Sequence, residues 1–209
     1  MEYPTISVII PAWDEEKTIA GVVEAFMHLE YIRPIIIAVD SKTTDDTAIT
    51  AGQQLRSLLN GWVLRDAGNG KGQVVTAALD EVRTEYVVFC DADITGLTAD
   101  HISLLCADAL IEEDSMTIGI ADIPENYPEN REWAWPWVSG IRCVPTRMVR
   151  PLHLHGYLME VQLNAAAKHA SMPARFEWLK GVTDPFDMTD RRLADMEKDA
   201  RWGHEHGIL

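Results

Sequence analysis

The stretch Tyr86-Val87-Val88-Phe89-Cys90-Asp91-Ala92-Asp93 is a continuous apolar run that ends in two carboxylates one residue apart. Its first five residues favour β structure without alternating, which is typical of a strand buried on both faces of a parallel sheet. Asp91 and Asp93 follow the carboxyl end of this strand, where ligands of open α/β sheets bind. Their oxygens suit Mg²⁺ or Mn²⁺ bound beside a diphosphate. An isolated Asp-x-Asp also fits a plain loop start, so the rest of the chain must decide.

Length and composition describe an ordinary globular chain. Its 209 residues, 47% hydrophobic and 24% charged, suit one domain with a substantial core. The sequence contains no run of 18 apolar residues and enters a strand soon after Met1, so we expect neither a signal peptide nor a membrane span, and a cytoplasmic protein. The three cysteines lack Cys-x-x-Cys spacing, which argues against a disulfide framework or a zinc site: Cys90, Cys106 and Cys143.

Charge separates one segment from the rest of the chain. The formal net charge of -15 disfavours general adhesion to nucleic acid or to anionic membranes, and no membrane partner is expected. Residues 131–150 depart from this average, because they combine basic and aromatic side chains: Arg131, Arg142, Arg147, Arg150, Trp133, Trp135 and Trp137. We call this segment the Trp/Arg segment. It could bind an anion, or its tryptophans could simply pack a compact second half.

The first half alternates buried strands with amphipathic helices. Strands are predicted at 5–10, 35–39, 62–64 and 86–89, and helices at 15–29, at about 46–59 and around Val74–Val82. This rhythm predicts a doubly wound α/β fold with an open, mostly parallel sheet flanked by helices. Polar residues follow each strand, beginning at Pro11, Asp40, Gly70 and Asp91. Because parallel strands place their carboxyl ends along one edge, these groups should converge on a single crevice.

The rhythm changes after Asp93. We expect helices at 98–111 and 156–170, strands at 116–120 and 175–179, and a terminal helix at 187–202. The predicted fold includes a smaller acceptor-side region beside the sheet. Residues 1–95 are interpreted as a donor-binding half, and residues 96–209 as an acceptor-binding half with a C-terminal helix, within one compact domain. A homodimer is left open.

The glycine-rich loop Gly68-Asn69-Gly70-Lys71-Gly72 matches neither the P-loop pattern nor G-x-G-x-x-G. Kinase, NTPase and dinucleotide-binding functions therefore lose support. The loop is either a solvated turn or a flexible loop in which Lys71 meets a phosphate as a point charge. No Gly-x-Ser-x-Gly is present, which counts against an α/β-hydrolase.

In order and spacing, four motifs over about residues 5–95 resemble the GT-A fold of family 2 nucleotide-sugar glycosyltransferases. They are Ser7–Ile19, Val39–Thr47, Gly70–Gly72 and Asp91–Asp93. The resemblance is greatest to the glucosyl-3-phosphoglycerate synthase and mannosylglycerate synthase branch, in which a Gly-Tyr-Gly-x-Glu segment near the acceptor is similar to Gly156–Glu160. It implies a nucleotide-sugar donor such as UDP-glucose and a Mn²⁺ or Mg²⁺ ion.

The resemblance also implies roles for individual residues. Asp93 and Glu160 would be catalytic, with Glu160 positioning the acceptor or acting as general base. The nucleotide-sugar set comprises Pro11, Ala12, Glu15, Asp40, Ser41, Lys71, Asp91 and Ala92. Asp91 and Asp93 would hold the metal, with a further ligand among Asp184, Asp187, His204 and His206, because the family's late histidine is missing after Gly181-Val182. The acceptor set is predicted from the second half of the chain itself, from the charges of its arginines, its aromatic side chains and the Gly156–Glu160 segment: Arg142, Arg147, Tyr157 and Trp137.

We therefore predict a metal-dependent transfer of a hexose from a UDP-sugar, or a GDP-sugar, to a hydroxyl of an anionic acceptor. A phosphorylated small molecule fits the arginines, since guanidinium groups fork onto phosphate. DNA with hydroxymethylated pyrimidines is the alternative acceptor, because the tryptophans could stack an extruded base. A sugar nucleotidyltransferase and a catalytically inactive binding module are two further alternatives.

Overall fold

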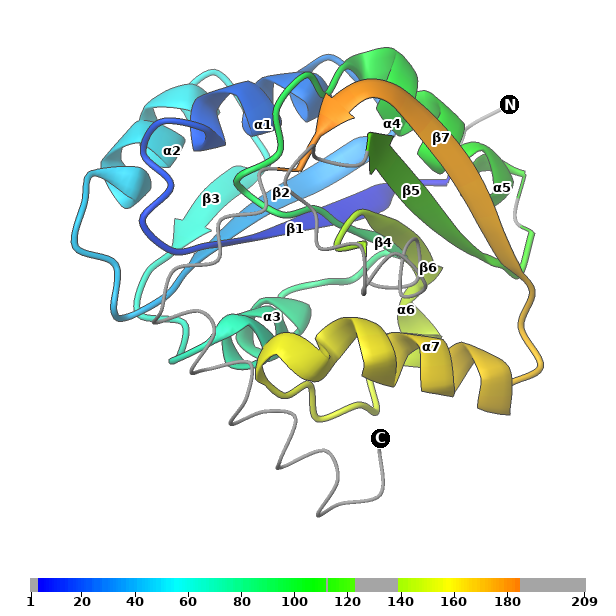
Figure 1. The fold of residues 1–209 in the computed structure, drawn as a ribbon. Helices are drawn as coiled ribbons and strands as arrows, with labels where there is room; N and C mark the ends of the chain where they lie inside the picture. Colours follow the sequence, from blue (N-terminus) through cyan, green and yellow to red (C-terminus); the bar gives the residue numbers. More distant parts are fainter. Residues whose placement is uncertain (1–3, 112, 123–138, 185–209) are drawn as a thin grey trace.

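The computed structural model describes residues 4–111, 113–122 and 139–184. Its centre is a seven-stranded sheet with the strand order β3-β2-β1-β4-β6-β5-β7 (Figure 1). The strands are β1 (Ile6–Ala12), β2 (Ile32–Val39), β3 (Gly61–Leu64), β4 (Tyr86–Phe89), β5 (Met116–Asp122), β6 (Arg142–Pro145) and β7 (Ala174–Thr183). Strands β1 to β4 pair in parallel, as do β5 and β7, whereas β6 is antiparallel to both of its neighbours. The prediction of an open, mostly parallel sheet is confirmed.

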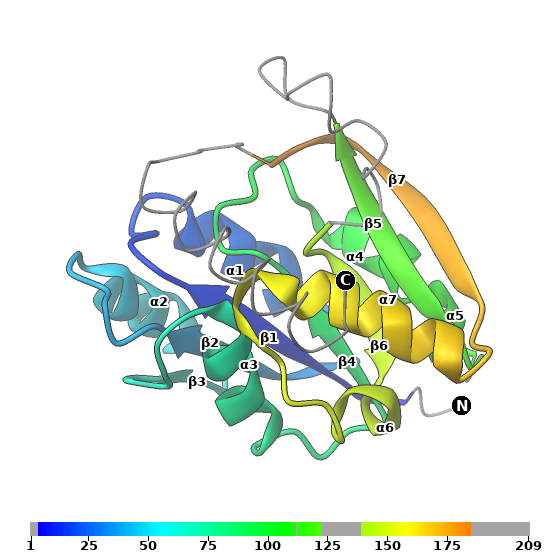
Figure 2. The same cartoon turned by 60° about the horizontal axis from the view of Figure 1, so that its bottom comes forward.

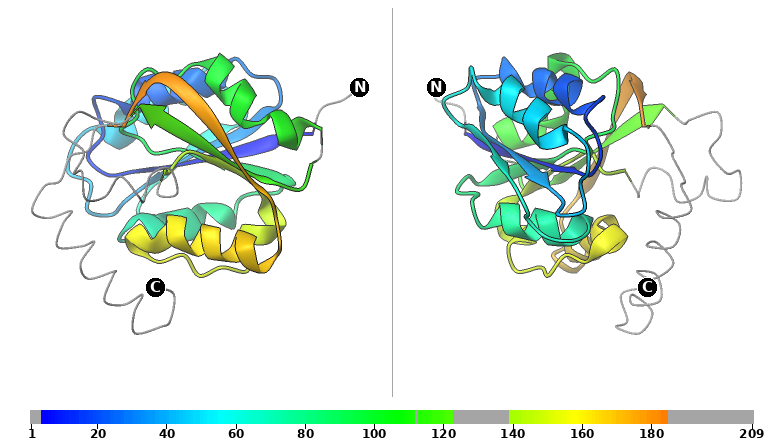
Figure 3. Two further views of the ribbon diagram at one scale, coloured as in Figure 1. Left: turned by 45° about the vertical axis from the view of Figure 1, so that its right-hand side comes forward. Right: turned by 90° about the vertical axis from the view of Figure 1, so that its left-hand side faces the viewer.

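Helices cover both faces of this sheet and make three layers (Figures 2 and 3). One face packs against α1 (Ile19–Met27), α2 (Thr47–Leu55), α4 (Ala99–Leu105) and α5 (Ala107–Leu110). The other packs against α3 (Lys71–Leu79), α6 (Thr146–Val149), the 3₁₀ turn η2 (Gly156–Leu158) and α7 (Met159–His169). Each face of the sheet has its own buried apolar cluster, which is why the inner strands are apolar without alternation.

Most predicted elements of the first half are found, with helices shorter than predicted. The predicted helix at 98–111 divides at Cys106 into α4 and α5, and its predicted cap is confirmed, because the Thr98 hydroxyl accepts from the His101 amide at 3.4 Å. Two elements, β6 and α6, lie within the Trp/Arg segment and were not predicted. Arginine in a strand that is buried throughout breaks the apolar pattern on which the prediction rests. The predicted terminal helix at 187–202 lies outside the described residues.

The two predicted halves contribute to the same sheet. The pairing of β4 with β6 joins them, since Tyr86 is opposite Pro145 and Phe89 is opposite Arg142. The division at residue 95 stays a prediction. Within the described residues, no helix combines the length and the apolar character needed to cross a membrane.

Candidate functional site

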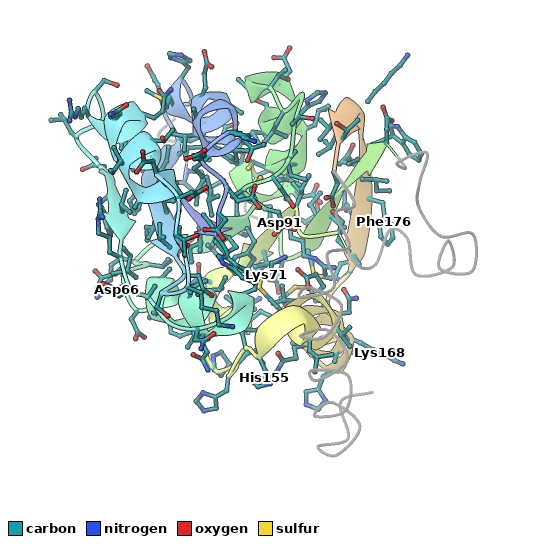
Figure 4. The ribbon with its side chains drawn as sticks, turned by 60° about the vertical axis from the view of Figure 1, so that its left-hand side comes forward. Asp66, Lys71, Asp91, His155, Lys168 and Phe176 are labelled. Atoms are coloured by element: carbon teal, nitrogen blue, oxygen red, sulfur yellow. The ribbon has the colours of Figure 1, made fainter. Side chains whose placement is uncertain are left out.

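A cleft opens at the carboxyl ends of β1, β2 and β4, beside the amino end of α3. Its lining comes from all four predicted motifs: Pro11, Ala12, Trp13, Glu15, Asp40, Lys42, Gly70, Lys71, Val74, Asp91, Ala92 and Asp93. Parallel pairing brings these strand ends together. Lys71, at the start of α3, lies beside Asp91, which follows β4 (Figure 4). We call this region the carboxyl-end cleft. Of the residues predicted to bind the nucleotide sugar, Ser41 is not part of the lining; it is exposed, and its amide donates to the Gly68 carbonyl at 2.9 Å.

Asp40 fixes the glycine-rich loop at one side of the cleft. Its buried carboxylate accepts from the Lys42 amide at 2.8 Å and from the Gly70 amide at 2.5 Å. Gly70 has a φ of 103°, a conformation that side-chain-bearing residues rarely adopt. Asp40 therefore ties the end of β2 to the residue that precedes α3, and so sets where Lys71 begins that helix.

Lys71 lies between two carboxylates, Asp91 from the first half of the sequence and Glu160 from the second. Its Nζ is 2.6 Å from Asp91 Oδ1 and 2.6 Å from Glu160 Oε1. Burial alone would lower the lysine pKa, but the charges of Asp91 and Glu160 outweigh it and hold the pKa of Lys71 above its ordinary value. The lysine is therefore a permanent cation that joins β4 to α7.

Close backbone contact between α3 and η2 permits this bridge. A Cβ added to Gly72 would lie 2.6 Å from the backbone nitrogens of His155 and Gly156. Only glycine allows that approach, which places Lys71 opposite the first turn of α7, where Glu160 lies. The glycine-rich loop therefore serves packing as well as the cleft.

Asp184 lies near enough to Asp91 and Asp93 for their charges to act on it. Burial, together with the negative charges of Asp93 and Asp91, raises the pKa of Asp184 to about 7. Of the four further metal ligands that we considered, Asp184 is thus brought close to the Asp-x-Asp motif. Asp187, His204 and His206 lie outside the described residues.

These carboxylates fit the Mn²⁺ or Mg²⁺ ion that the resemblance implies. Within the described residues, no group of three His, Cys, Asp or Glu side chains is arranged to hold a metal by itself. A small hard cation does not require such a group, because it commonly takes one or two carboxylates and completes its shell with substrate phosphates and water. Asp91 and Asp93, which both line the cleft, satisfy that requirement together with a bound diphosphate.

Gly140 forms the wall behind Asp91, and our sequence analysis missed it. A Cβ added to Gly140 would overlap the carboxylate of Asp91. Its neighbour Ser139 is buried and donates from Oγ to the Gly119 carbonyl at 2.6 Å, which holds this turn in place. A single glycine within the Trp/Arg segment carries no signal of its own, because the contact depends on the unpredicted strand β6.

Arg142 is not an exposed residue of a basic surface. It is 0% exposed, and its guanidinium donates to the Ser139 carbonyl at 2.7 Å and to Asn164 Oδ1 at 2.6 Å. Burial lowers its pKa to about 10, while the nearby charges of Glu160 and Asp91 act in the opposite direction. The prediction that Arg142 forks directly onto an acceptor is therefore corrected: its guanidinium lies behind Glu160 and binds protein groups.

Arg147 lies at the wrong end of the sheet for its predicted role. Strand β6 is antiparallel to β4, so the residues after Pro145 lie beside Tyr86, at the amino end of β4. There Arg147 pairs with Asp114, and Arg150 donates to the Val82 carbonyl at 2.9 Å. We call this region, with its cavity lined also by Thr84 and Tyr86, the amino-end surface. Trp137 and the side chain of Tyr157 lie outside what the structure describes.

Trp13 and Lys42 line the cleft although we did not single them out. Lys42 Nζ lies 5.5 Å from the centre of the Trp13 ring, so the two side chains form a cation–π pair in the lining of the carboxyl-end cleft. Trp13 directly follows β1, and Lys42 lies in the loop after β2; this position beyond a strand end is the signal that could have identified them. Glu15 lies in the same wall, where its amide donates to the Thr47 hydroxyl at 2.7 Å.

Comparison with known proteins agrees with this geometry. Residues 7–171 match the family described as Glycosyl transferase family 2, which is well over half of the chain. The chain belongs to this family. It is also 36% identical over 94 residues to a glucosyl-3-phosphoglycerate synthase of Mycolicibacterium paratuberculosis. That match covers 43% of this chain and 29% of the relative, so the chain matches less than a third of the relative's length.

Solved structures extend the likeness to the second half of the chain. Glucosyl-3-phosphoglycerate synthase from Mycobacterium tuberculosis in complex with Mn²⁺ and UDP-glucose aligns with a TM-score of 0.78 and 20% identity, over 99% of this chain and 80% of that chain. The complex that also contains phosphoglyceric acid aligns with a TM-score of 0.76 over 93% and 76% of the two chains. At this identity the likeness establishes the fold, and the GT-A prediction is confirmed.

Proposed function

We propose that this protein transfers a glucosyl group from UDP-glucose to a hydroxyl of a phosphorylated small molecule, with Mn²⁺ as cofactor. The observation that carries the proposal is the carboxyl-end cleft, where Asp40, Lys71, Asp91 and Asp93 line one wall of a family 2 glycosyltransferase fold. The relatives support the choice of donor and acceptor, since they are named for glucosyl transfer to 3-phosphoglycerate and were solved with UDP-glucose and phosphoglyceric acid.

The nucleotide would occupy the part of the cleft between β1 and β2. Pro11 and Ala12 give it an apolar floor, Trp13 a flat face for a base, and Asp40 a buried carboxylate that can accept from a uracil imide. A guanine also presents donors to a carboxylate, so GDP-sugars belong in the test panel.

The diphosphate would lie over the amino end of α3, near Lys71, Asp91 and Asp93. A divalent cation bound there would supply positive charge to the departing nucleoside diphosphate. The protein's own part is to hold two carboxylates for that cation and to keep Lys71 protonated beside the same phosphates. Mg²⁺ has the same ligand preference and is the alternative cofactor.

The acceptor would approach from the side of α7. Glu160 lies in the first turn of that helix, 2.6 Å from the cleft residue Lys71, with only 8% of its side chain exposed. An acceptor hydroxyl within hydrogen-bond reach of Glu160 would be oriented toward the sugar. This role for Glu160, together with the catalytic role of Asp93, stays a prediction.

The test is a product assay with purified protein, UDP-glucose, Mn²⁺ and 3-phosphoglycerate. We expect release of UDP that requires both the acceptor and the cation, and formation of a glucosylated phosphoglycerate detected by mass spectrometry. GDP-glucose, UDP-galactose, Mg²⁺ and glycerol 3-phosphate complete the panel. Absence of nucleoside diphosphate release with every donor and acceptor would refute the proposal.

Two alternatives are included as controls. A sugar nucleotidyltransferase would release pyrophosphate, and membership of a glycosyltransferase family does not support it. Transfer to hydroxymethylated DNA relied on an exposed basic surface, whereas Arg142 is buried and Arg147 lies at the amino-end surface. A hydroxymethylcytosine oligonucleotide in the acceptor panel should therefore remain unglucosylated.

A further inference from the structure

Arg142 is the largest fully buried side chain among the described residues. Burying a guanidinium in a protein core is costly unless every donor is matched by an acceptor. A hydrophobic residue would suit the middle of an apolar sheet better, since Val87, Val88, Cys143 and Val144 surround this pairing of β4 with β6. The charge of Arg142 therefore calls for an explanation beyond packing.

The contacts of Arg142 lead toward two carboxylates of the proposed site, through Ser139 and Gly140 on one side and through Asn164 on the other. Its Nε donates to the Ser139 carbonyl at 2.7 Å, and the next residue, Gly140, is the wall against which the Asp91 carboxylate lies. Its Nη1 donates to Asn164 Oδ1 at 2.6 Å. Asn164 is one helical turn after Glu160 on α7, so both residues lie on the same face of that helix.

Lys71 joins the same two carboxylates from the opposite side. It contacts Asp91 and Glu160 directly, and it lies in the cleft, where a diphosphate would compete for its charge. Once a bound diphosphate pairs with Lys71, another side chain must fix the distance between the Asp91 and Glu160 carboxylates. Arg142 is suited to this, because it lies behind the cleft and a ligand in the cleft does not reach it.

We propose that Arg142 is a positioning residue, which holds Asp91 and Glu160 at a fixed separation through Ser139–Gly140 and Asn164. This inference rests on the proposed glycosyl transfer for its kinetic consequences and on the contacts above for its geometry. It assigns Arg142 no contact with the acceptor, which distinguishes it from an arginine that binds phosphate. Substitution should therefore affect turnover more than affinity.

The kinetic test uses Arg142→Met, which keeps much of the side-chain volume and removes the guanidinium group. We expect kcat to fall about 30-fold, because a displacement of the reacting groups by less than 1 Å has effects of this order. The KM values for UDP-glucose and for the acceptor should stay within about threefold, since the groups proposed to contact them are intact. Arg150→Met is the matched control: it also removes a guanidinium that donates to a backbone carbonyl, and it should leave kcat unchanged.

Two further variants keep the inference testable if Arg142→Met does not fold. Asn164→Leu removes the acceptor on α7 and should lower kcat, whereas Asn164→Asp keeps an acceptor for Arg142 and should largely preserve it. If Arg142 and Asn164 had a purely structural role, the variants would lower the melting temperature, but kcat would not differ between Asn164→Leu and Asn164→Asp. Unchanged kcat in both Arg142→Met and Asn164→Leu, or parallel loss of kcat and donor affinity, would overturn the inference.

A crystal structure of a folded variant tests the geometry whatever the reaction is. In crystals with bound UDP, which draws on Lys71, we expect the separation of Asp91 from Glu160 in Arg142→Met or Asn164→Leu to differ from that in the wild type, where Lys71 joins both carboxylates at 2.6 Å. If the separation with bound UDP is the same in the variant and the wild type, positioning by Arg142 is refuted even when the wild type transfers glucose. If the carboxylates separate but the wild type transfers no sugar, the positioning role stands and the proposed function fails.

Discussion

Charged side chains gather at both ends of β4, but the two groups differ in how far water reaches them. In the carboxyl-end cleft, the side chains of Lys71 and Asp91 are 17% and 21% exposed and form an ion pair. At the amino-end surface, Arg147 and Asp114 are 62% and 58% exposed. Charge pairs are strong where water is excluded and weak where it is not. The location of charged side chains along β4, more than their number, therefore distinguishes the carboxyl-end cleft from the amino-end surface.

The strongest test of this comparison removes a cleft carboxylate. Asp93→Ala should lower the rate of UDP-glucose turnover about 10³-fold, because a metal ion contributes several kcal/mol of charge stabilisation that the variant would lose. Turnover with saturating Mn²⁺ and the Mn²⁺ dependence of UDP binding by calorimetry are the measurements. Asp80→Ala, an exposed carboxylate at the end of α3, is the control. Full turnover by Asp93→Ala would remove the metal assignment.

The next largest effect concerns the cation that joins the two halves of the chain. Lys71→Met leaves Asp91 and Glu160 facing each other without a counter-ion, so we expect a loss of about 3 kcal/mol in stability and of about 10²-fold in kcat/KM. Chemical denaturation and steady-state kinetics measure the two effects. Lys168→Met, at the exposed end of α7, is the matched control and should be nearly neutral.

The pH dependence of the stability difference between the wild type and Lys71→Met gives an independent check on the ion pairs of Lys71. The pKa of Lys71 is raised above its ordinary value of 10.5, so the stability that its charge contributes is fully present below that value and is lost only as pH rises beyond it. The stability gap between the wild type and Lys71→Met should therefore be the same at pH 7 and pH 9. A gap that closes by pH 9 would mean that burial, and not Asp91 and Glu160, dominates the titration of Lys71.

A smaller effect is expected at the wall behind Asp91. Gly140→Ala places a methyl group against that carboxylate in a turn that Ser139 holds rigid, so Asp91 must shift. We expect about 1–3 kcal/mol of destabilisation from overpacking. Activity should fall roughly tenfold, because the Asp91 carboxylate is displaced. Gly21→Ala, on α1 with no atom within 4 Å of the added Cβ, should be neutral or stabilising by up to about 1 kcal/mol. Equal activity of the two variants would contradict the tight contact.

Much of the carboxyl-end cleft was predictable because it is encoded locally. Asp40, Lys71 and Asp91 each follow a strand that an apolar run identifies, and parallel strands fix where such ends meet. The position of Arg147 at the amino-end surface was not predicted, because it depends on a long-range property.

Arg147 would lie near the carboxyl-end cleft only if β6 ran parallel to β4. The direction of a strand relative to its neighbour is a long-range property that no local sequence pattern reveals.

The same limit applies to Gly140 and Arg142. Their importance comes from contacts with Asp91 and Asn164 that arise only after β6 pairs between β4 and β5. An arginine in a tryptophan-rich segment is typical of an exposed binding surface, so sequence favoured the wrong environment for it. Lys71 and Glu160 are 89 residues apart, and their pairing likewise follows from packing of α3 against η2.

The smallest expected effect tests the amino-end surface itself. Arg147→Ala and Asp114→Ala each break an exposed pair, which contributes about 0–1 kcal/mol, and neither residue lies at the end of β4 where Asp91 does. We therefore expect kcat and both KM values to stay within about twofold of the wild type, with the double variant no worse than the singles. Acceptor KM is the decisive measurement, because a basic residue that binds phosphate raises it when removed. A tenfold rise for Arg147→Ala, absent from Asp114→Ala, would place the anionic acceptor at the amino end of β4 and would reverse the distinction between the two regions.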